Sequence, residues 1–300
     1  MNLIFNSSQD VMAIVPISAD VSFTKLRSYL LIAQSFVERY IGSSLMTIVA
    51  SSPSANAGLA QLIRVPVANL ALMKYLGTNA AQITDMGLLR NVSETQKDAF
   101  EWQHNLVATN LQSQAWDGLE ALLQHIENNL SLFPDYTASA QYQQNRTYLI
   151  QSATVFDSFY PISGSRLVFS TLQPALREAE VRRIRPVLGV RHAELLADSL
   201  TPAQTTLLEV ARRALVYTTM GIALRQRMVD VTDQGVQVRG ISQFSAIKYE
   251  QPADEKRLQN SLQFFDQEAA ELLDQMAGLV RPTPRPTRGS RIQGGAIVAF

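Results

Sequence analysis

Apolar residues recur every three or four positions along most of the chain, which is the spacing of one face of an α-helix. The pattern predicts helices near residues 22–41, 58–77, 167–188 and 202–227. A further long helix follows each pair of these helices. The clearest apolar stripe, with spacings of four and three, lies in the last of them and consists of Leu258, Leu262, Phe265, Ala269, Leu272 and Met276. Such a stripe needs a partner helix, and we expect that partner within the same chain rather than in another subunit.

Local signals mark the ends of several of these helices. Gly42 and Gly189 follow the last apolar position of a predicted helix. Glycine is typical there because it adopts the left-handed conformation at little cost. Before the helix at 202–227, Thr201 can cap, Pro202 occupies the first helical position, and Gln204 can complete a capping box.

The pattern of the first half recurs in the second half. Pro16-Ile17-Ser18 recurs as Pro161-Ile162-Ser163, and Thr84-Asp85-Met86-Gly87 recurs as Thr232-Asp233-Gln234-Gly235. Between these segments, Phe23, Leu26, Leu30 and Ala33 match Phe169, Leu172, Leu176 and Ala179, and Tyr40-Ile41-Gly42 matches Val187-Leu188-Gly189. The separation of matching residues grows from 145 to 148 positions, as small insertions in loops would make it. The order of the matches predicts an internal duplication.

Each Thr-Asp-x-Gly segment predicts the turn of a β-hairpin, and in the second half four valines alternate with polar residues around it: Val229, Val231, Val236 and Val238. The predicted fold is therefore mainly α. It consists of two tandem copies of a helical-bundle unit, each with a short β-hairpin, and an extended C-terminal arm. The expected segments are a first unit at 1–130, a linker at 131–160, a second unit at 161–280 and the arm at 281–300.

The arm differs from the rest of the chain in composition. Its prolines force extended backbone, and its arginines have no acidic residue in the same segment. We expect it to dock on a portal protein or another subunit by strand addition and charge-assisted pairing. The residues expected to bind are Arg281, Arg285, Arg288, Arg291, Ile297, Val298 and Phe300.

Overall composition narrows the function classes. Lys plus Arg and Asp plus Glu are 26 each, so net charge gives no reason to expect binding to nucleic acid or to an anionic membrane. The absence of cysteine excludes disulfides, cysteine-based zinc sites and thiol catalysis. The most apolar segment, residues 59–76, is interrupted by Arg64, Pro66 and Lys74, so no membrane-spanning helix is predicted and we expect a cytoplasmic protein.

Candidate chemistry is sparse. His104, His125 and His192 have no second histidine or carboxylate at the spacing of a metal site. Asp230 and Asp233 lack the ligand spacing of a calcium loop and fit the hairpin turn better. We therefore expect no catalytic residue, no metal site and no cofactor.

The basic run from Arg177 to Arg185 contains Glu178 and Glu180. A nucleic-acid patch needs clustered positive charge without such acids. The run predicts a salt-bridged, solvated face or a subunit contact instead. Because the two glutamates lie two positions apart on a helix, they should face different directions and form no carboxylate pair.

The second half resembles the helical head–tail connector (adaptor) proteins of tailed bacteriophages. The resemblance covers residues 165–280 well and 16–128 weakly. The motifs that carry it are Phe169-x-x-Leu172, Glu178-Ala179-Glu180, Pro186-Val-Leu-Gly189, Leu207-Leu208 and Thr232-Asp-Gln-Gly235. The duplication departs from the single unit usual in that family, which leaves the number of subunits in the ring open.

This resemblance implies a structural virion protein of the head–tail neck, assembled in the host cytoplasm. The implied partners are the portal protein, copies of the chain in a ring, and tail or further neck proteins. DNA would only pass through the lumen, and no membrane would be involved. The alternative is a cytoplasmic helical interaction, regulatory or scaffolding module with no virion role. A weaker rival is an enzyme of unfamiliar type that uses carboxylates alone. A measurement of particle size distinguishes the first two: a closed ring would favour the connector, and a small oligomer would favour the regulatory module.

Overall fold

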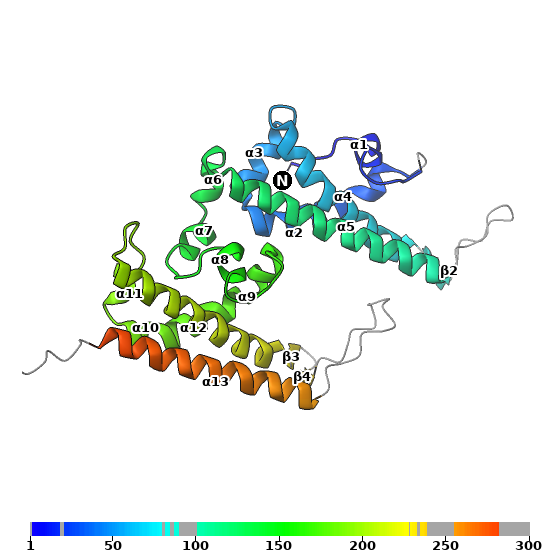
Figure 1. Cartoon of the computed structure of the whole chain (residues 1–300). Helices are drawn as coiled ribbons and strands as arrows, with labels where there is room; N and C mark the ends of the chain where they lie inside the picture. The colour runs from blue at the N-terminus through cyan, green and yellow to red at the C-terminus, as the bar shows by residue number, and fades with distance from the viewer. Residues whose placement is uncertain are drawn as a thin grey trace, which may run out of the picture.

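The structure is a computed structural model of the 300-residue chain, and its description covers most of the two predicted units. The residues described are 2–18, 21–79, 82–84, 87–89, 101–227, 229–232, 235–238 and 255–281. Over these residues the fold is mainly α, as predicted (Figure 1). We refer to residues 2–128 as the first half and to residues 148–281 as the second half.

The first half contains three long helices and several short elements. In chain order these are α1 (Ser8–Met12), α2 (Phe23–Ile41), α3 (Ser43–Ser51), α4 (Ala57–Asn79), β1 (Gln82–Thr84), β2 (Gly87–Leu89) and α5 (Glu101–Asn128). A 3-10 turn and two short helices then lead to the second half: Leu130–Leu132, α6 (Pro134–Thr137) and α7 (Ala140–Asn145).

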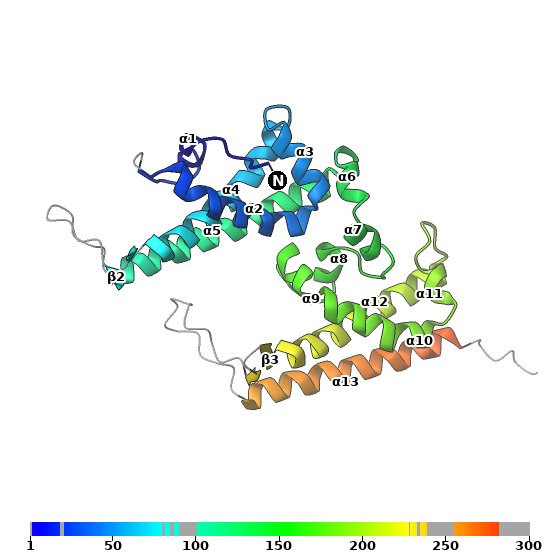
Figure 2. The same cartoon turned by 180° about the vertical axis from the view of Figure 1, so that it is seen from behind.

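The second half presents a similar order of elements. They are α8 (Ala153–Asp157), α9 (Arg166–Ala179), a π-helical turn (Glu180–Ile184), α10 (Arg185–Leu188), α11 (Arg191–Glu194), α12 (Pro202–Arg227), β3 (Val229–Thr232), β4 (Gly235–Val238) and α13 (Glu255–Val280). β1 pairs antiparallel with β2, and β3 with β4. The residues between the paired strands lie outside the described residues. Both pairs lie at the same end of the molecule in both views (Figures 1 and 2).

The predicted helix ends are confirmed. Gly42 has a φ of 87° and Gly189 a φ of 56°, and each follows the last residue of a helix. Thr201 and Gln204 form the predicted capping box. The Thr201 backbone N–H donates to Gln204 Oε1 at 2.9 Å, and the Gln204 N–H donates to Thr201 Oγ1 at 3.4 Å. These contacts satisfy N–H groups at the start of α12 that have no partner within the helix.

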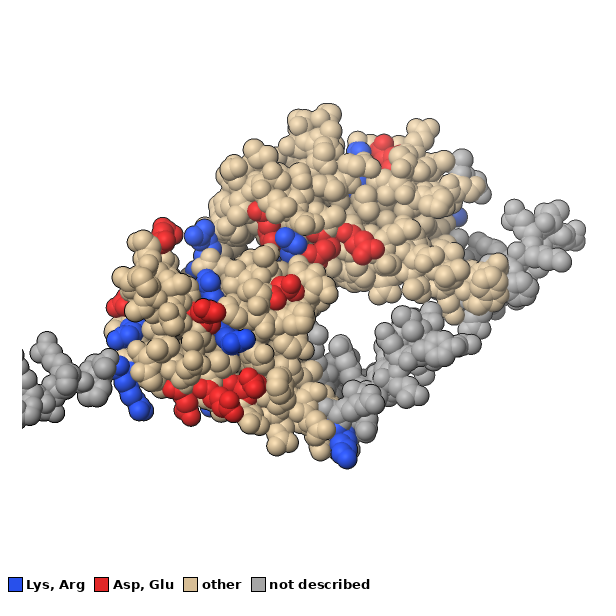
Figure 3. All heavy atoms as spheres, in the orientation of Figure 1, with Lys and Arg blue, Asp and Glu red and all other residues tan. Residues whose placement is uncertain are grey.

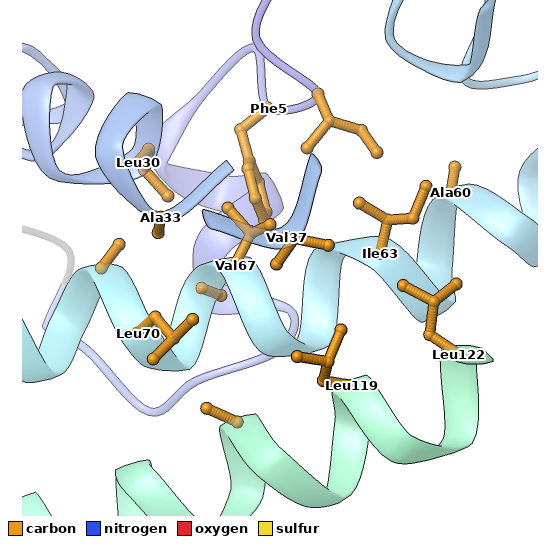
Figure 4. Close-up of a cluster of buried hydrophobic side chains, with 14 of the residues drawn as sticks. Phe5, Leu30, Ala33, Val37, Ala60, Ile63, Val67, Leu70, Leu119 and Leu122 are labelled. Atoms are coloured by element: carbon orange, nitrogen blue, oxygen red, sulfur yellow. The ribbon is translucent and has the colours of Figure 1, made fainter. Parts of the chain in front are cut away.

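The core of the first half lies among α2, α4 and α5, and residues before α2 close one side of it (Figure 4). Gly118 allows a close approach of α5 to α4, because a Cβ at this position would lie 2.7 Å from Cγ1 of Val65. The largest fully buried side chains here include Phe5, Leu30, Ile63 and Leu119. Burial of each such side chain contributes about 1.5–3 kcal/mol, so this half holds a core of its own.

The core of the second half lies among α9, α12 and α13. The apolar stripe on α13 packs within the chain as predicted, since Phe265, Ala269 and Met276 are buried and α13 lies against α12. The core also takes in residues that we expected in the linker. Leu149 and Phe156 are fully buried in this cluster. The sequence pattern missed them because a buried segment of turns and bends and one short helix show no helical periodicity.

Candidate functional site

The arm that carries the predicted binding residues lies almost entirely outside the described residues. Arg281 is exposed at the end of α13, and its backbone N–H donates to the carbonyl of Ala277 at 3.1 Å. The other predicted residues, Arg285, Arg288, Arg291, Ile297, Val298 and Phe300, are outside the described part of the chain. The arm's role in docking therefore stays a prediction.

The three histidines lie apart from one another. His104 is exposed on α5, and the ring of His125 lies 5.9 Å from the ring of Phe133, centroid to centroid. Within the described ranges, no group of three or more potential ligand side chains could hold a metal ion. No described helix is long and apolar enough to cross a membrane.

A buried polar arrangement in the first half joins an N-terminal segment to two helices. The Gln34 side chain on α2 is fully buried, and its Oε1 accepts the Ile4 N–H at 2.9 Å. Nε and Nη2 of Arg64, on α4, donate to the Ile4 carbonyl at 3.2 and 3.0 Å. Both backbone polar groups of one buried residue, Ile4, are thus satisfied by side chains rather than by a strand partner.

The same arrangement occurs in the second half. Glu180 is fully buried, and its Oε2 accepts the Leu149 N–H at 3.0 Å. Nε of Arg212, on α12, donates to the Leu149 carbonyl at 2.9 Å, and burial of this guanidinium lowers its pKa. Residues 149, 180 and 212 follow residues 4, 34 and 64 by 145, 146 and 148 positions. These separations agree with the sequence matches between the halves.

Glu180 also holds two groups that have no counterpart around Gln34. His192 Nε2 lies 2.8 Å from Glu180 Oε1, and Arg185 Nη2 lies 3.4 Å from the same oxygen. The expectation of a solvated face is wrong for Glu180, which is 0% exposed, whereas Glu178 pairs with Arg182 at 3.2 Å near the surface. A buried carboxylate needs such partners because an unpaired one is strongly disfavoured.

The chemistry around Glu180 was not visible from the sequence. His192 lies 12 positions beyond Glu180, after the π-helical turn and Gly189. No spacing rule for helices connects residues across such a break. The only available signal was the match of Glu180 to the polar residue Gln34, one position after the matched alanines at 33 and 179.

Acidic side chains of α5 hold the two halves together. The Glu120 carboxylate accepts the backbone N–H groups of Arg166 at 2.9 Å and Leu167 at 3.2 Å, and the Ser165 hydroxyl at 3.1 Å. It therefore caps the N-terminus of α9, where negative charge is favourable. Arg166 Nε also donates to Glu127 Oε2 at 2.6 Å.

A cavity of about 390 Å³ lies beside this junction. Residues that line it include Tyr40, Glu127, Tyr136, Arg166 and Gln173. Burial raises the pKa of Glu127, although the Arg166 cation opposes this, and burial together with the Glu127 charge raises the pKa of Tyr136 to about 12. Figure 3 shows that, on this face, charged side chains gather over the second half and along the junction.

The two halves differ at the groove between the first long helix and the last. In the first half two aromatic side chains meet there, Phe36 from α2 and Trp116 from α5, with ring centroids 5.5 Å apart. In the second half a groove of about 460 Å³ remains between the π-helical turn, α12 and α13. Charged residues surround it, among them Arg182 and Asp266.

One comparison with known proteins gives a match. The model of a family of unknown function (DUF6712) matches residues 30–146 and 172–281, which together make up more than half of the chain. The first matched segment runs from within α2 to just past α7, and the second from within α9 to the end of α13. No curated protein and no solved structure matches the chain significantly.

Proposed function

This chain belongs to the DUF6712 family of unknown function. We propose that it is a structural assembly protein of a bacteriophage head–tail neck. In this proposal copies of the chain form a ring between the portal protein and the tail or further neck proteins. DNA passes through the lumen of the ring, and the chain carries out no catalysis.

The neck role rests on the sequence resemblance, and the structural observation that supports the duplicated unit is the repeated buried arrangement. Ile4, Gln34 and Arg64 in the first half correspond to Leu149, Glu180 and Arg212 in the second. A shared order of helices alone is weak support for a duplication, because helical bundles resemble one another. A side-chain pair that satisfies both backbone polar groups of one buried residue, at matching positions, is much harder to obtain twice by chance. It supports two tandem copies of one unit, each with its hairpin of strands.

The contact between the halves supports a ring rather than a closed pair. It joins two different surfaces, the C-terminal part of α5 in one half and the N-terminus of α9 in the other. When two units meet through unlike surfaces, each keeps one unused surface, so repetition of the contact leads to a ring or a filament. Both pairs of strands also lie at one end of the molecule (Figures 1 and 2). A ring built from such units would present them all on one side.

We further propose that the C-terminal arm attaches the ring to the portal. Arg281 is exposed where α13 ends. Arginines can pair bidentately with acidic side chains of the portal, and the apolar residues at 297–300 can add a strand to it.

The test is a mass measurement on the purified 33.2 kDa chain, alone and with its proposed partner, the portal protein. Light scattering after size exclusion should give a closed oligomer of many subunits, either for the chain alone or for its complex with the portal. A monomer or dimer under both conditions would favour the regulatory or scaffolding module instead.

A further inference from the structure

Equivalent positions in the two grooves can be identified from the helices beside them. Leu111, Ala115 and Leu122 are buried on α5, and Phe265, Ala269 and Met276, each 154 positions later, are buried on α13. By that separation Trp116 corresponds to Ala270. The matches at Leu30 and Ala33 are 146 positions from their partners, so Phe36 corresponds to Arg182. Both Arg182 and Ala270 line the groove of the second half, which supports the assignment.

The groove of the second half is therefore hollow where the first half is filled. Ala270 replaces an indole, and Arg182 replaces a phenyl ring and extends into solvent with 75% of its side chain exposed. The floor retains apolar side chains, including Ile222 and Leu273. The Thr218 hydroxyl is buried at the groove and has no hydrogen-bond partner among the described residues.

The chain contains two tryptophans. Trp116 fills the groove of the first half, whereas Trp102 is 63% exposed in the first turn of α5. Leu106 and Val107, on the next turn, are 51% and 46% exposed. Large exposed apolar side chains on neighbouring turns of one helix are typical of a protein–protein contact. Their position at the start of α5 leaves them far along the helix from Glu120 and the junction.

We propose that Trp102 of one copy inserts into the groove of the second half of the next copy. The inference rests on the proposed ring, and it names the contact that joins neighbouring chains. An indole fits the space that Trp116 occupies in the equivalent groove. The apolar floor buries its ring, the guanidinium groups at the rim can stack on its face, and Thr218 can accept from its N–H.

This contact joins unlike surfaces, a tryptophan on the first half and a groove on the second. It therefore leaves one free groove and one free tryptophan on every pair of chains, and it continues until a ring closes. The ion pair between Arg225 and Asp266 beside the groove keeps its charges compensated when the indole displaces water.

Two variants test the contact from both sides. Trp102→Ala removes the inserting side chain, and Ala270→Trp fills the groove within its own chain, as Trp116 does in the first half. Leu132→Ala is the matched control, because Leu132 is 68% exposed and lies away from both surfaces. Circular dichroism and thermal melting check that each variant folds, and sedimentation velocity measures its assembly.

We expect each of the two variants to sediment as a monomer at concentrations where the wild type and the control assemble. Mixed in equal amounts, the two variants should form a 1:1 dimer and stop there, since one keeps the groove and the other keeps the tryptophan. Assembly of both variants like the wild type would overturn this inference and leave the proposed ring standing. A wild type that stays monomeric alone overturns this contact too, while a ring formed only on the portal would still support the proposed function.

Discussion

The two halves have a similar order of helices but differ in the residue buried at their polar centres. In the first half the buried residue is an amide, and backbone groups alone satisfy it: Gln34 accepts from Ile4 and donates from Nε2 to the Asn2 carbonyl at 2.8 Å. In the second half the buried residue is a carboxylate, and Glu180 requires His192 and Arg185 in addition. Gln34 thus joins α2 to the N-terminal segment, whereas Glu180 also ties α10 and α11 to the core of the second half.

The two polar centres need not contribute equally to stability. A buried amide exchanges hydrogen bonds to water for hydrogen bonds within the protein, with a modest net gain in stability, whereas a buried charge is costly to leave without its partners. The second half should therefore depend more strongly on its polar centre. Four predictions test this comparison.

The largest effect is expected from Glu180→Leu. It leaves the Leu149 N–H without its acceptor and removes the anion beside Arg185 and His192, so it should lower the free energy of unfolding by about 3–5 kcal/mol. Glu180→Gln, which makes the second half resemble the first, should cost only about 1–2 kcal/mol. Urea unfolding measures both, and equal losses for the two variants would show that the charge does not matter.

The second prediction concerns how closely the long helices pack in the two halves. A Cβ at Gly118 would meet Val65 and Pro66 of α4, so Gly118→Ala should destabilise the first half by about 1–3 kcal/mol through overpacking. Gly278→Ala on α13 is the control, because nothing lies within 4 Å of the added carbon there. It should stabilise the helix by about 0.5–1 kcal/mol. A stabilising Gly118→Ala would mean that α4 and α5 lie farther apart than described.

The third prediction concerns the junction between the halves. The pKa of Glu127 is raised in the folded state, so its contribution to stability is fully present below the pKa of the unfolded chain and is lost as pH rises through the folded pKa. As pH rises, the free energy of unfolding of the wild type should fall relative to that of Glu127→Gln by less than about 1 kcal/mol, because the Glu127 carboxyl is partly exposed. Chemical denaturation at a series of pH values from 4 to 7 measures the difference. A wild type that gains stability over this range would reverse the sign.

The smallest effect on stability is expected from truncation after Val280. The first half continues from α5 into further structure, whereas the second half continues from α13 into the arm. Removing the arm should change the melting temperature very little, since no described core residue follows Val280. Co-sedimentation with the portal should be lost. Unfolding of the truncated chain would place the arm in the core, and normal portal binding would refute its role in docking.

Much of the fold could be predicted from local signals. Gly42 and Gly189 end helices because their backbone conformation demands it, and Thr201 with Gln204 fixes the start of α12 through bonds within four residues. Such features depend only on neighbours in the sequence. The apolar stripe of α13 likewise carried enough periodicity to indicate that it packs against another helix of the chain.

Other features depend on long-range contacts and could not be predicted. Residues 148–156 join the second core, and Leu149 among them is held by Glu180 and Arg212, which lie 31 and 63 positions beyond it. The link from Glu120 to the start of α9 spans 46 positions at Arg166. Single-sequence patterns carry no information about such pairs. The candidate site at the groove of the second half was also invisible, because it consists of side chains smaller or more polar than their counterparts.

The proposed ring is tested most directly by an electron-microscopic image of the chain purified with its proposed partner, the portal protein. We expect a closed ring of chains seated on one end of the portal, with an open lumen wide enough for DNA. Portal particles without added density, beside free chains that form no ring, would contradict it.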